Sequence, residues 1–277
     1  MKRIFLLFGA LLTLSAIHAD EGMWLLKELN RQSAARMQEL GFTFPIDSVY
    51  SEKNASLKDA VVIFGGGCTG VAVSQEGLIF TNHHCGYDAI QKHSSVEHDY
   101  LKDGFVSHSN AEELYTEGLT VSFLQKTEDV TSAVTAGVTD NMTEHERNTI
   151  IDSLSVKILD QYKGNEFLNA RIIPFYTGNK YYLVVYEVFR DVRMVFAPPS
   201  SIGKFGGDAD NWQWPRHTGD FSVFRVYANK DNQAANYSSD NVPYKPKYSV
   251  PVSIKGYKDK DYAMTIGYPG STERYLP

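Results

Sequence analysis

The chain has 277 residues, of which 43% are hydrophobic and 22% charged, and its formal net charge at pH 7 is −6. These fractions are ordinary for a globular protein and exclude a largely disordered or fibrous chain. Proteins that bind nucleic-acid duplexes usually carry a basic stripe that replaces the phosphate counterions. No block rich in lysine or arginine occurs, so the sequence argues against nucleic acid as a partner. The aromatic fraction of 13% favours β structure.

The N-terminus has the three parts of a secretory signal peptide. Lys2 and Arg3 form a basic head, residues 4–17 are almost entirely apolar, and small side chains near Ala19 mark a cleavage site. A membrane-spanning helix needs about 20 apolar residues, so this run is too short and stable membrane insertion is not expected. We interpret residues 1–19 as a signal peptide and expect an exported protein, in the periplasm or outside the cell. The two cysteines can therefore be oxidised.

The hydrophobic pattern predicts one helix, a set of strands and a polar, partly helical middle. Residues 22–40 read as a helix because apolar positions recur among charged ones and Gly41 can end it. In the middle stretch, Thr143-x-x-Glu146 has the spacing of a capping box and predicts a helix that stops at Gly164. The strands predicted on either side are residues 60–64, 70–74, 78–81, 181–189, 192–196, 221–227 and 263–266.

Two tight turns are expected between neighbouring strands. Gln75-Glu76-Gly77 separates two of the early strands, and Arg190-Asp191 is predicted as the tip of a later hairpin. The sequence shows neither an internal repeat nor a low-complexity tract. The predicted fold is therefore a mainly β domain with a helical insertion at about 88–170, in which both flanks contribute to one sheet or barrel.

Residues 65–86 hold the densest group of chemically capable side chains, which are Cys68, His83, His84 and Cys85. A phosphate-binding loop is disfavoured because no Gly-Lys-Ser/Thr follows and a strand comes next. A metal site is disfavoured because neighbouring side chains on a strand point to opposite faces and the cysteines lack the paired spacing of zinc sites. We therefore predict no metal. In a further alternative, one histidine is only a polar residue at a strand end.

The same residues resemble the first-barrel core of trypsin-like serine peptidases. In those enzymes the general-base histidine ends a strand directly before a cysteine, which is bonded to another cysteine on the facing strand. Here His84 directly precedes Cys85, and Cys68 lies 17 positions earlier. The resemblance implies a Cys68–Cys85 disulfide that clamps the strand carrying the imidazole and fixes the ring for proton transfer.

A general base of this kind needs a carboxylate that sets its tautomer. In the segment 206–227, Asp220 lies between a glycine and an alternating apolar strand, where trypsin-like enzymes place the orienting aspartate. Asp208 and Asp210 are weaker candidates because aspartates in a glycine-rich loop favour turns. Two tryptophans within three residues, the first of them Trp212, predict the wall of a binding cleft.

Several motifs, in order, resemble the bacterial dipeptidyl peptidase 7 / dipeptidyl peptidase 11 family of chymotrypsin-fold serine exopeptidases. They are Asp-Glu-Gly-Met-Trp, Gly-Gly-Cys-Thr-Gly, Thr-Asn-His-His-Cys-Gly-Tyr, Asn-Trp-x-Trp-Pro-Arg-His-Thr-Gly-Asp-Phe and Gly-Tyr-Pro-Gly-x-Thr-x-Arg-Tyr. The resemblance implies a periplasmic enzyme, generally dimeric, with two β-barrels and a large inserted helical domain. It implies release of dipeptides from the free amino end of oligopeptides. His84 and Asp220 resemble the family's catalytic residues, and Asn211 and Trp212 resemble residues that hold the substrate's amine.

The sequence departs from this family in its nucleophile. Neither Gly-Asp-Ser-Gly nor Gly-Asn-Ser-Gly occurs. We therefore expect residues 20–277 to be the N-terminal part of a peptidase domain, with an incomplete first barrel and no activity on its own. Two alternatives stay open: a secreted trypsin-like endopeptidase, which shares the Thr-Asn-x-His strand, and a peptidase-like binding module that has lost catalysis. No cofactor is predicted.

Overall fold

The computed structural model describes residues 24–29, 31–207 and 217–270. Eleven strands form one sheet, and every strand pair in the described part of the chain is antiparallel. The strands are β1 (Val61–Phe64), β2 (Cys68–Ala72), β3 (Leu78–Thr81), β4 (Phe105–Val106), β5 (Leu114–Tyr115), β6 (Val121–Asp129), β7 (Leu168–Phe175), β8 (Lys180–Phe189), β9 (Asp191–Ala197), β10 (Ser222–Ala228) and β11 (Val242–Pro243).

Helices are short except for two. The α-helices are α2 (Arg31–Glu39), α3 (His83–His93), α4 (Tyr100–Asp103), α5 (Thr131–Val134), α6 (Glu144–Leu159) and α7 (Ser200–Gly203). Single 3₁₀ turns are η1 (Leu26–Glu28), η2 (Ile46–Ser48), η3 (Leu57–Asp59), η4 (Asn110–Glu112), η5 (Asp160–Tyr162) and η6 (Tyr176–Gly178). Within the described ranges, none of these helices has both the length and the apolar character to cross a bilayer.

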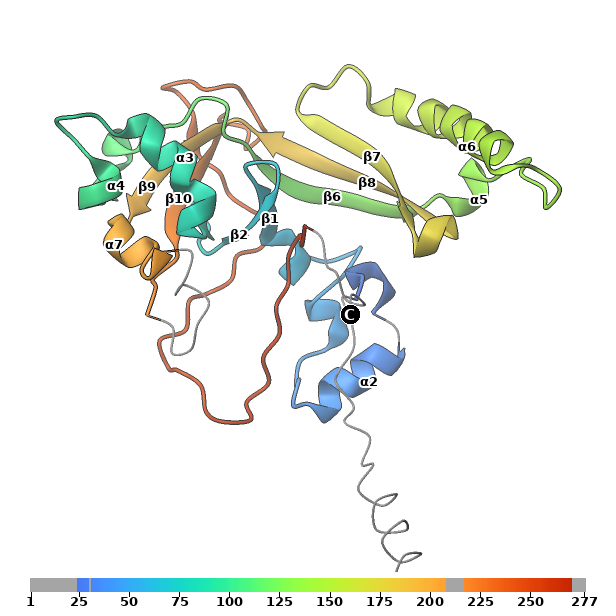
Figure 1. Ribbon diagram of the computed structural model, residues 1–277, viewed down its shortest axis with the longest axis horizontal. Helices are drawn as coiled ribbons and strands as arrows, with labels where there is room; N and C mark the ends of the chain where they lie inside the picture. The colour runs from blue at the N-terminus through green and yellow to red at the C-terminus, as the bar shows by residue number, and fades with distance from the viewer. Residues whose placement is uncertain (1–23, 30, 208–216, 271–277) are drawn as a thin grey trace, which may run out of the picture.

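The sheet is hydrogen-bonded in the order β4-β9-β10-β3-β2-β1-β6-β8-β7, with β5 added to β9 and β11 to β10. Helices α3, α4 and α7 lie beside β9 and β10 at one end of the molecule (Figure 1). At the other end, β6, β7 and β8 extend as a long arm, and α5 and α6 lie along it (Figure 1). The predicted mainly β fold with helices is confirmed at this level.

The main hydrophobic core joins the central strands to α3. Phe64 on β1, Ile79 on β3 and Phe224 on β10 are almost fully buried, and the rings of Phe64 and Phe224 lie 4.8 Å apart. Ala89 and Ile90 bring α3 into the same cluster. A second core packs α5 and α6 onto the β7–β8 arm, and a third forms beneath α2. Because α3 belongs to the main core, the residues at its start are held rigidly relative to the sheet.

The hairpin predicted between residues 181–189 and 192–196 is wrong. The two runs form β8 and β9, but β8 pairs with β6 and β7, whereas β9 pairs with β4, β5 and β10. A two-residue hairpin turn requires positive φ at one or both central positions. Neither Arg190 nor Asp191 has a positive φ. The chain therefore continues through Arg190 from one part of the sheet into another without reversing.

The stretch 88–170 contributes more to the sheet than a helical insertion would. Its capping box at Thr143 and Glu146 forms and starts α6, as the spacing predicts. The same stretch, however, supplies β4, β5 and β6, and β6 lies between β1 and β8. The second half of β6, at 125–129, is entirely polar, so it lacks the alternation of apolar and polar residues that is typical of a strand. The strands β4 and β5 are only two residues long. Alternation cannot reveal strands of either kind.

Two other predicted elements differ from the structure. No strand forms at 263–266, where the chain is irregular and mostly exposed. In the described part of 22–40, η1 precedes a shorter helix, α2, instead of one continuous helix. The buried side chain of Met37 on α2 packs in a small cluster that also includes Tyr262. This contact between segments far apart in the sequence is one that no local pattern reports.

A disulfide joins Cys68, the first residue of β2, to Cys85 in the first turns of α3. Their Cα atoms are 6.1 Å apart, and the enclosed loop contains the β2–β3 hairpin. The bond therefore attaches the start of α3 to β2, the neighbour of the strand that leads into the helix.

We expect the double substitution of Cys68 and Cys85 by alanine in the full-length protein to lower the free energy of unfolding by about 3 kcal/mol, because the loop regains its freedom in the unfolded chain. Urea denaturation checks this. A reductant should shift the midpoint of the parent protein similarly and leave that of the double variant unchanged. Equal midpoints for the parent protein with and without reductant would contradict the prediction.

Candidate active site

Chemically capable side chains gather where β3 ends and α3 begins. β3 ends at Thr81, Asn82 is the N-cap residue with φ −71° and ψ 153°, and His83 and His84 open the helix. The histidines therefore lie in the first turn of a helix, which corrects the prediction that they end a strand. Asparagine is a preferred N-cap residue, and this was the signal for a helix start in the sequence.

The structure brings His84 and Asp220 together across 136 positions of sequence. The Nδ1 atom of His84 lies 2.7 Å from Oδ2 of Asp220, and the His84 backbone N–H donates to Oδ1 at 3.1 Å. The carboxylate thus holds the imidazole ring and also accepts from the first turn of α3. A negative charge at this end of a helix is favourable because the helix dipole is positive there.

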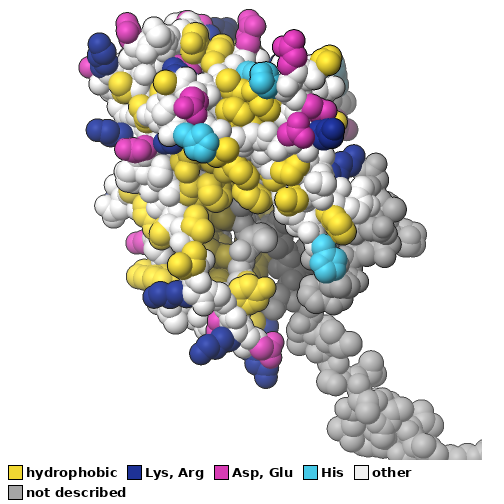
Figure 2. Space-filling model, turned by 90° about the vertical axis from the view of Figure 1, so that its left-hand side faces the viewer, with side chains coloured by type: hydrophobic (Ala, Val, Ile, Leu, Met, Phe, Trp, Pro, Cys, Tyr) yellow, Lys and Arg dark blue, Asp and Glu magenta, His cyan; other side chains and the backbone are white. Residues whose placement is uncertain are grey.

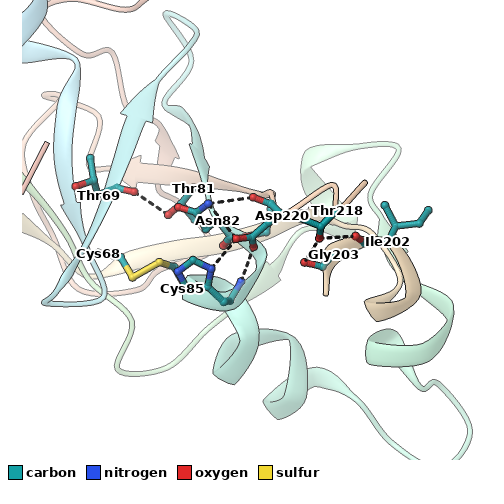
Figure 3. Close-up of polar contacts among 11 residues, drawn as sticks. Cys68, Thr69, Thr81, Asn82, Cys85, Ile202, Gly203, Thr218 and Asp220 are labelled. Carbon is teal, nitrogen blue, oxygen red and sulfur yellow. Dashed lines mark hydrogen bonds and ion pairs between the residues drawn. A yellow bond between two sulfur atoms is a disulfide. The ribbon is translucent and has the colours of Figure 1, made fainter. Parts of the chain in front are cut away.

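The pairing of β3 with β10 explains why His84 and Asp220 lie close together. β10 runs antiparallel to β3, and Ser222 lies opposite Thr81. The residues just before β10 therefore face those just after β3. The approach to β10 is fixed by Thr218, whose single hydroxyl hydrogen lies within reach of two acceptors, the carbonyl oxygens of Ile202 at 3.0 Å and Gly203 at 3.2 Å, and is donated to one of them at a time (Figure 3). The sequence analysis gave Thr218 no role of its own, although it lies in the His-Thr-Gly-Asp-Phe part of a family motif.

The two side chains differ in their exposure to solvent. The side chain of Asp220 is 9% exposed and that of His84 is 57% exposed. Because a carboxylate accepts hydrogen bonds, its contact with Nδ1 assigns the proton of the neutral ring to that nitrogen. This leaves Nε2 with the lone pair, and among the described residues nothing hydrogen-bonds to it. The arrangement can take a proton from a group that approaches Nε2.

His83 is placed quite differently. The residue is 1% exposed, and burial lowers its pKa, which favours the neutral imidazole. The ring packs so closely on Gly203 of α7 that a Cβ there would lie 2.4 Å from ring carbons. Its Nε2 atom is buried without a hydrogen-bond partner in the part of the chain that the structure describes. These features fit the alternative in which one of the two histidines is structural.

The histidine and the two cysteines also form a group with metal-ligand chemistry. One ligand atom each from Cys68, His84 and Cys85 lie within 4.8 Å of one another, and no other such group occurs among the described residues. Zinc binding by cysteine requires thiolates. Since the two sulfurs are bonded to each other, they are not available as thiolates.

An exposed apolar face adjoins this pair. Ile202, Phe205 and Phe221 are 48%, 50% and 40% exposed, and the ring of Phe221 stacks on that of Phe196 at 5.4 Å. Figure 2, which looks from the side of α4 and α7, shows hydrophobic side chains gathered into one area with histidines at its edge. Exposed apolar areas are typical of surfaces that contact another molecule.

Several predicted residues lie outside the described part of the chain. They are Asn211 and Trp212, the weaker candidates Asp208 and Asp210, and the whole of the predicted signal peptide at 1–19.

Comparison with known proteins gives one family. The peptidase S46 model matches residues 19–277. Dipeptidyl-peptidase 7 of Porphyromonas gingivalis is 58% identical over 282 residues, which cover 100% of this chain and 39% of that protein. The Asp/Glu-specific dipeptidyl-peptidase of Porphyromonas endodontalis is 50% identical, with 99% of this chain and 39% of that protein covered. The chain thus spans about two fifths of the length of these relatives.

Solved structures agree. The crystal structure of Porphyromonas endodontalis DPP11 in complex with the dipeptide Arg-Glu has a TM-score of 0.79 and 50% sequence identity, and the match covers 87% of this chain and 36% of that one. The alternate conformation of the same enzyme gives a TM-score of 0.80 with 51% identity, over 88% of this chain and 37% of that one. The resemblance stated from sequence motifs is confirmed, and the chain belongs to the peptidase S46 family.

Proposed function

We propose that the protein is a serine-type dipeptidyl aminopeptidase, which releases dipeptides from the free N-terminus of oligopeptides. His84 is the general base of its catalytic triad and Asp220 the carboxylate that orients it. The observation that carries this proposal is the 2.7 Å contact between Nδ1 of His84 and Oδ2 of Asp220, in which 57% of the His84 side chain stays exposed to solvent. We propose that the nucleophilic serine is supplied from outside these 277 residues, because neither Gly-Asp-Ser-Gly nor Gly-Asn-Ser-Gly occurs in them.

The relatives support the reaction class. Proteins named dipeptidyl-peptidase 7 and Asp/Glu-specific dipeptidyl-peptidase are 58% and 50% identical to this chain, and a DPP11 structure contains a bound dipeptide. Because the identity extends over essentially the whole chain, we infer that this protein shares their peptide substrates and their dipeptide product.

The geometry suits nucleophilic catalysis. Nε2 of His84 takes the proton of the serine hydroxyl while the serine oxygen attacks the carbonyl after the second substrate residue. Asp220 stabilises the imidazolium that forms, and its low exposure strengthens this interaction because less water screens it. The imidazolium then gives its proton to the departing amine. Water hydrolyses the acyl-enzyme with the help of the same base.

We also propose that residues 20–277 are the N-terminal part of the peptidase domain. In this proposal the eleven-stranded sheet contributes the first barrel of a chymotrypsin-like pair. The uninterrupted passage from β8 through Arg190 into β9 supports this, because it connects strands near opposite ends of the hydrogen-bonded order. A strand that bends in this way can turn a sheet back toward itself.

The substrate's free amine needs acceptors and its side chains need apolar contact. We propose that Asn211 offers its amide oxygen to the ammonium group and that Trp212 offers an aromatic wall. The apolar face of Ile202, Phe205 and Phe221 adds contact area next to Asp220. The basic head and apolar run at the N-terminus support export to the periplasm or beyond, and we propose that the full-length enzyme forms a homodimer, as the family resemblance implies.

Replacing His84 by alanine in the full-length protein should lower kcat by about 10⁴-fold or more, because no other group can take the serine proton. Release of a dipeptide from a fluorogenic substrate measures this. His145→Ala, which removes an exposed histidine on α6, is the matched control and should keep the parent rate. A His84→Ala enzyme as active as the control would contradict the proposed base.

Acetylating the substrate's N-terminus separates the three candidate functions. We expect dipeptide release from the free peptide and no cleavage of its N-acetyl form, because the ammonium group is what an exopeptidase cleft binds. Product analysis by mass spectrometry checks both reactions. Cleavage of the two peptides alike would indicate an endopeptidase, and binding of peptide without cleavage would indicate a binding module.

A further inference from the structure

Asn82 occupies a helix N-cap position without using its side chain as a cap. Residues of this type at an N-cap usually accept a hydrogen bond from a backbone N–H in the first turn. The Asn82 side chain makes no such bond with α3. The backbone N–H of His84 donates instead to Oδ1 of Asp220 at 3.1 Å. The usual capping role has therefore passed to the aspartate, and the amide of Asn82 is free for another partner.

That partner is Asp220 itself. The Asn82 amide nitrogen donates to Oδ2 of Asp220 at 3.2 Å and to the Asp220 backbone oxygen at 3.1 Å (Figure 3). An amide NH₂ group has two hydrogens, so both bonds can exist together. Both partners are acceptors, and this fixes the orientation of the amide, with its nitrogen toward Asp220.

Asn82 is itself held in place. Its backbone oxygen accepts from the hydroxyl of Ser222 at 2.9 Å and from the backbone N–H of Gly86 at 3.1 Å. It therefore lies between β10 and α3, with its amide directed at Asp220, two positions before β10. A donor fixed in this way can position a carboxylate without moving itself.

The carboxylate needs such a donor. The terminal torsion of an aspartate is broad, so one contact does not fix the plane of the carboxylate. Oδ1 of Asp220 accepts from the His84 backbone, and Oδ2 accepts from both the His84 ring and Asn82. The ring is the group that must stay free to change its charge during the reaction. Within the described ranges, Asn82 is the side chain, apart from the ring, that hydrogen-bonds Oδ2 and so sets its direction.

We propose that Asn82 is a positioning residue of the active site: its amide holds the Asp220 carboxylate so that Oδ2 faces Nδ1 of His84 and keeps the proton on that nitrogen. The inference rests on the proposed peptidase function. It predicts that loss of the amide reduces the chemical step and leaves substrate binding largely intact.

Asn82→Ser in the full-length protein tests this against a purely structural role. Serine is as good an N-cap residue as asparagine, but its hydroxyl has one hydrogen and cannot donate to both acceptors. We expect kcat to fall by about 10- to 100-fold, the loss typical when a hydrogen-bonded support of a reactive group is removed, with little change in KM. Asn82→Ala should behave in the same way. If Asn82→Ser keeps the parent kcat, the two amide hydrogen bonds to Asp220 are not needed for the chemical step and the proposal is overturned.

Thr143→Ala is the control for helix capping. It removes a working capping box at the start of α6, so it should lower the unfolding midpoint and leave kcat unchanged. The proposal fails if kcat in the Asn82 variants falls only when their unfolding midpoint also falls. In that case the substitutions act through the stability of the protein.

A proton NMR measurement makes the test independent of activity. The Nδ1–H proton between His84 and Asp220 should give a far-downfield signal, which His84→Ala removes and so assigns. We expect this signal to move upfield or be lost by exchange in Asn82→Ser and to stay unchanged in Thr143→Ala. An unchanged signal in Asn82→Ser would overturn the inference. If Asn82→Ser loses the signal but the parent protein releases no dipeptide, the proposed function is overturned and the positioning role is supported.

Discussion

The candidate active site depends on the carboxylate of Asp220, which lies at the N-terminal end of α3. Asp220 accepts the backbone N–H of His84 with Oδ1 and contacts the ring of the same residue with Oδ2. A single carboxylate thus caps α3 and orients an imidazole. The two roles support each other, because the helix dipole favours the negative charge that the imidazolium form of His84 would need beside it. Stability at this point of the fold and readiness for proton transfer have the same physical origin.

Close packing keeps this arrangement in register. Gly86 lies in α3 at a point where a Cβ would come 2.6 Å from the hydroxyl of Ser222, so the helix can touch β10 only because this residue has no side chain. Gly203 does the same for α7, which rests on the buried ring of His83. The disulfide ties the start of α3 to β2. The helix is therefore held from three directions, and the exposed ring of His84 projects from a rigid base.

The sequence was most informative about the candidate site, where short motifs name the residues directly. The pairing of Cys68 with Cys85, and the choice of His84 and Asp220 as partners, followed from a resemblance carried by a few motifs, and the structure places these residues together. The helix beneath the histidines was missed because Asn82 is compatible with both a strand end and an N-cap. The course of the chain through Arg190 was missed because turn residues were inferred from polarity, whereas backbone dihedral angles decide whether a strand reverses. The role proposed for Asn82 depends on a contact 138 positions away, which only the folded structure reveals.

The central claim is that the Asp220 carboxylate holds the imidazole of His84 in the state that accepts a serine proton. Asp220→Asn tests it most directly, because the amide keeps the shape of the side chain but can present a donor to Nδ1 and so favour the wrong tautomer. The account predicts that kcat for dipeptide release by the full-length protein falls by about 10⁴-fold while the protein stays folded. A folded Asp220→Asn enzyme with kcat within about tenfold of the parent would contradict it.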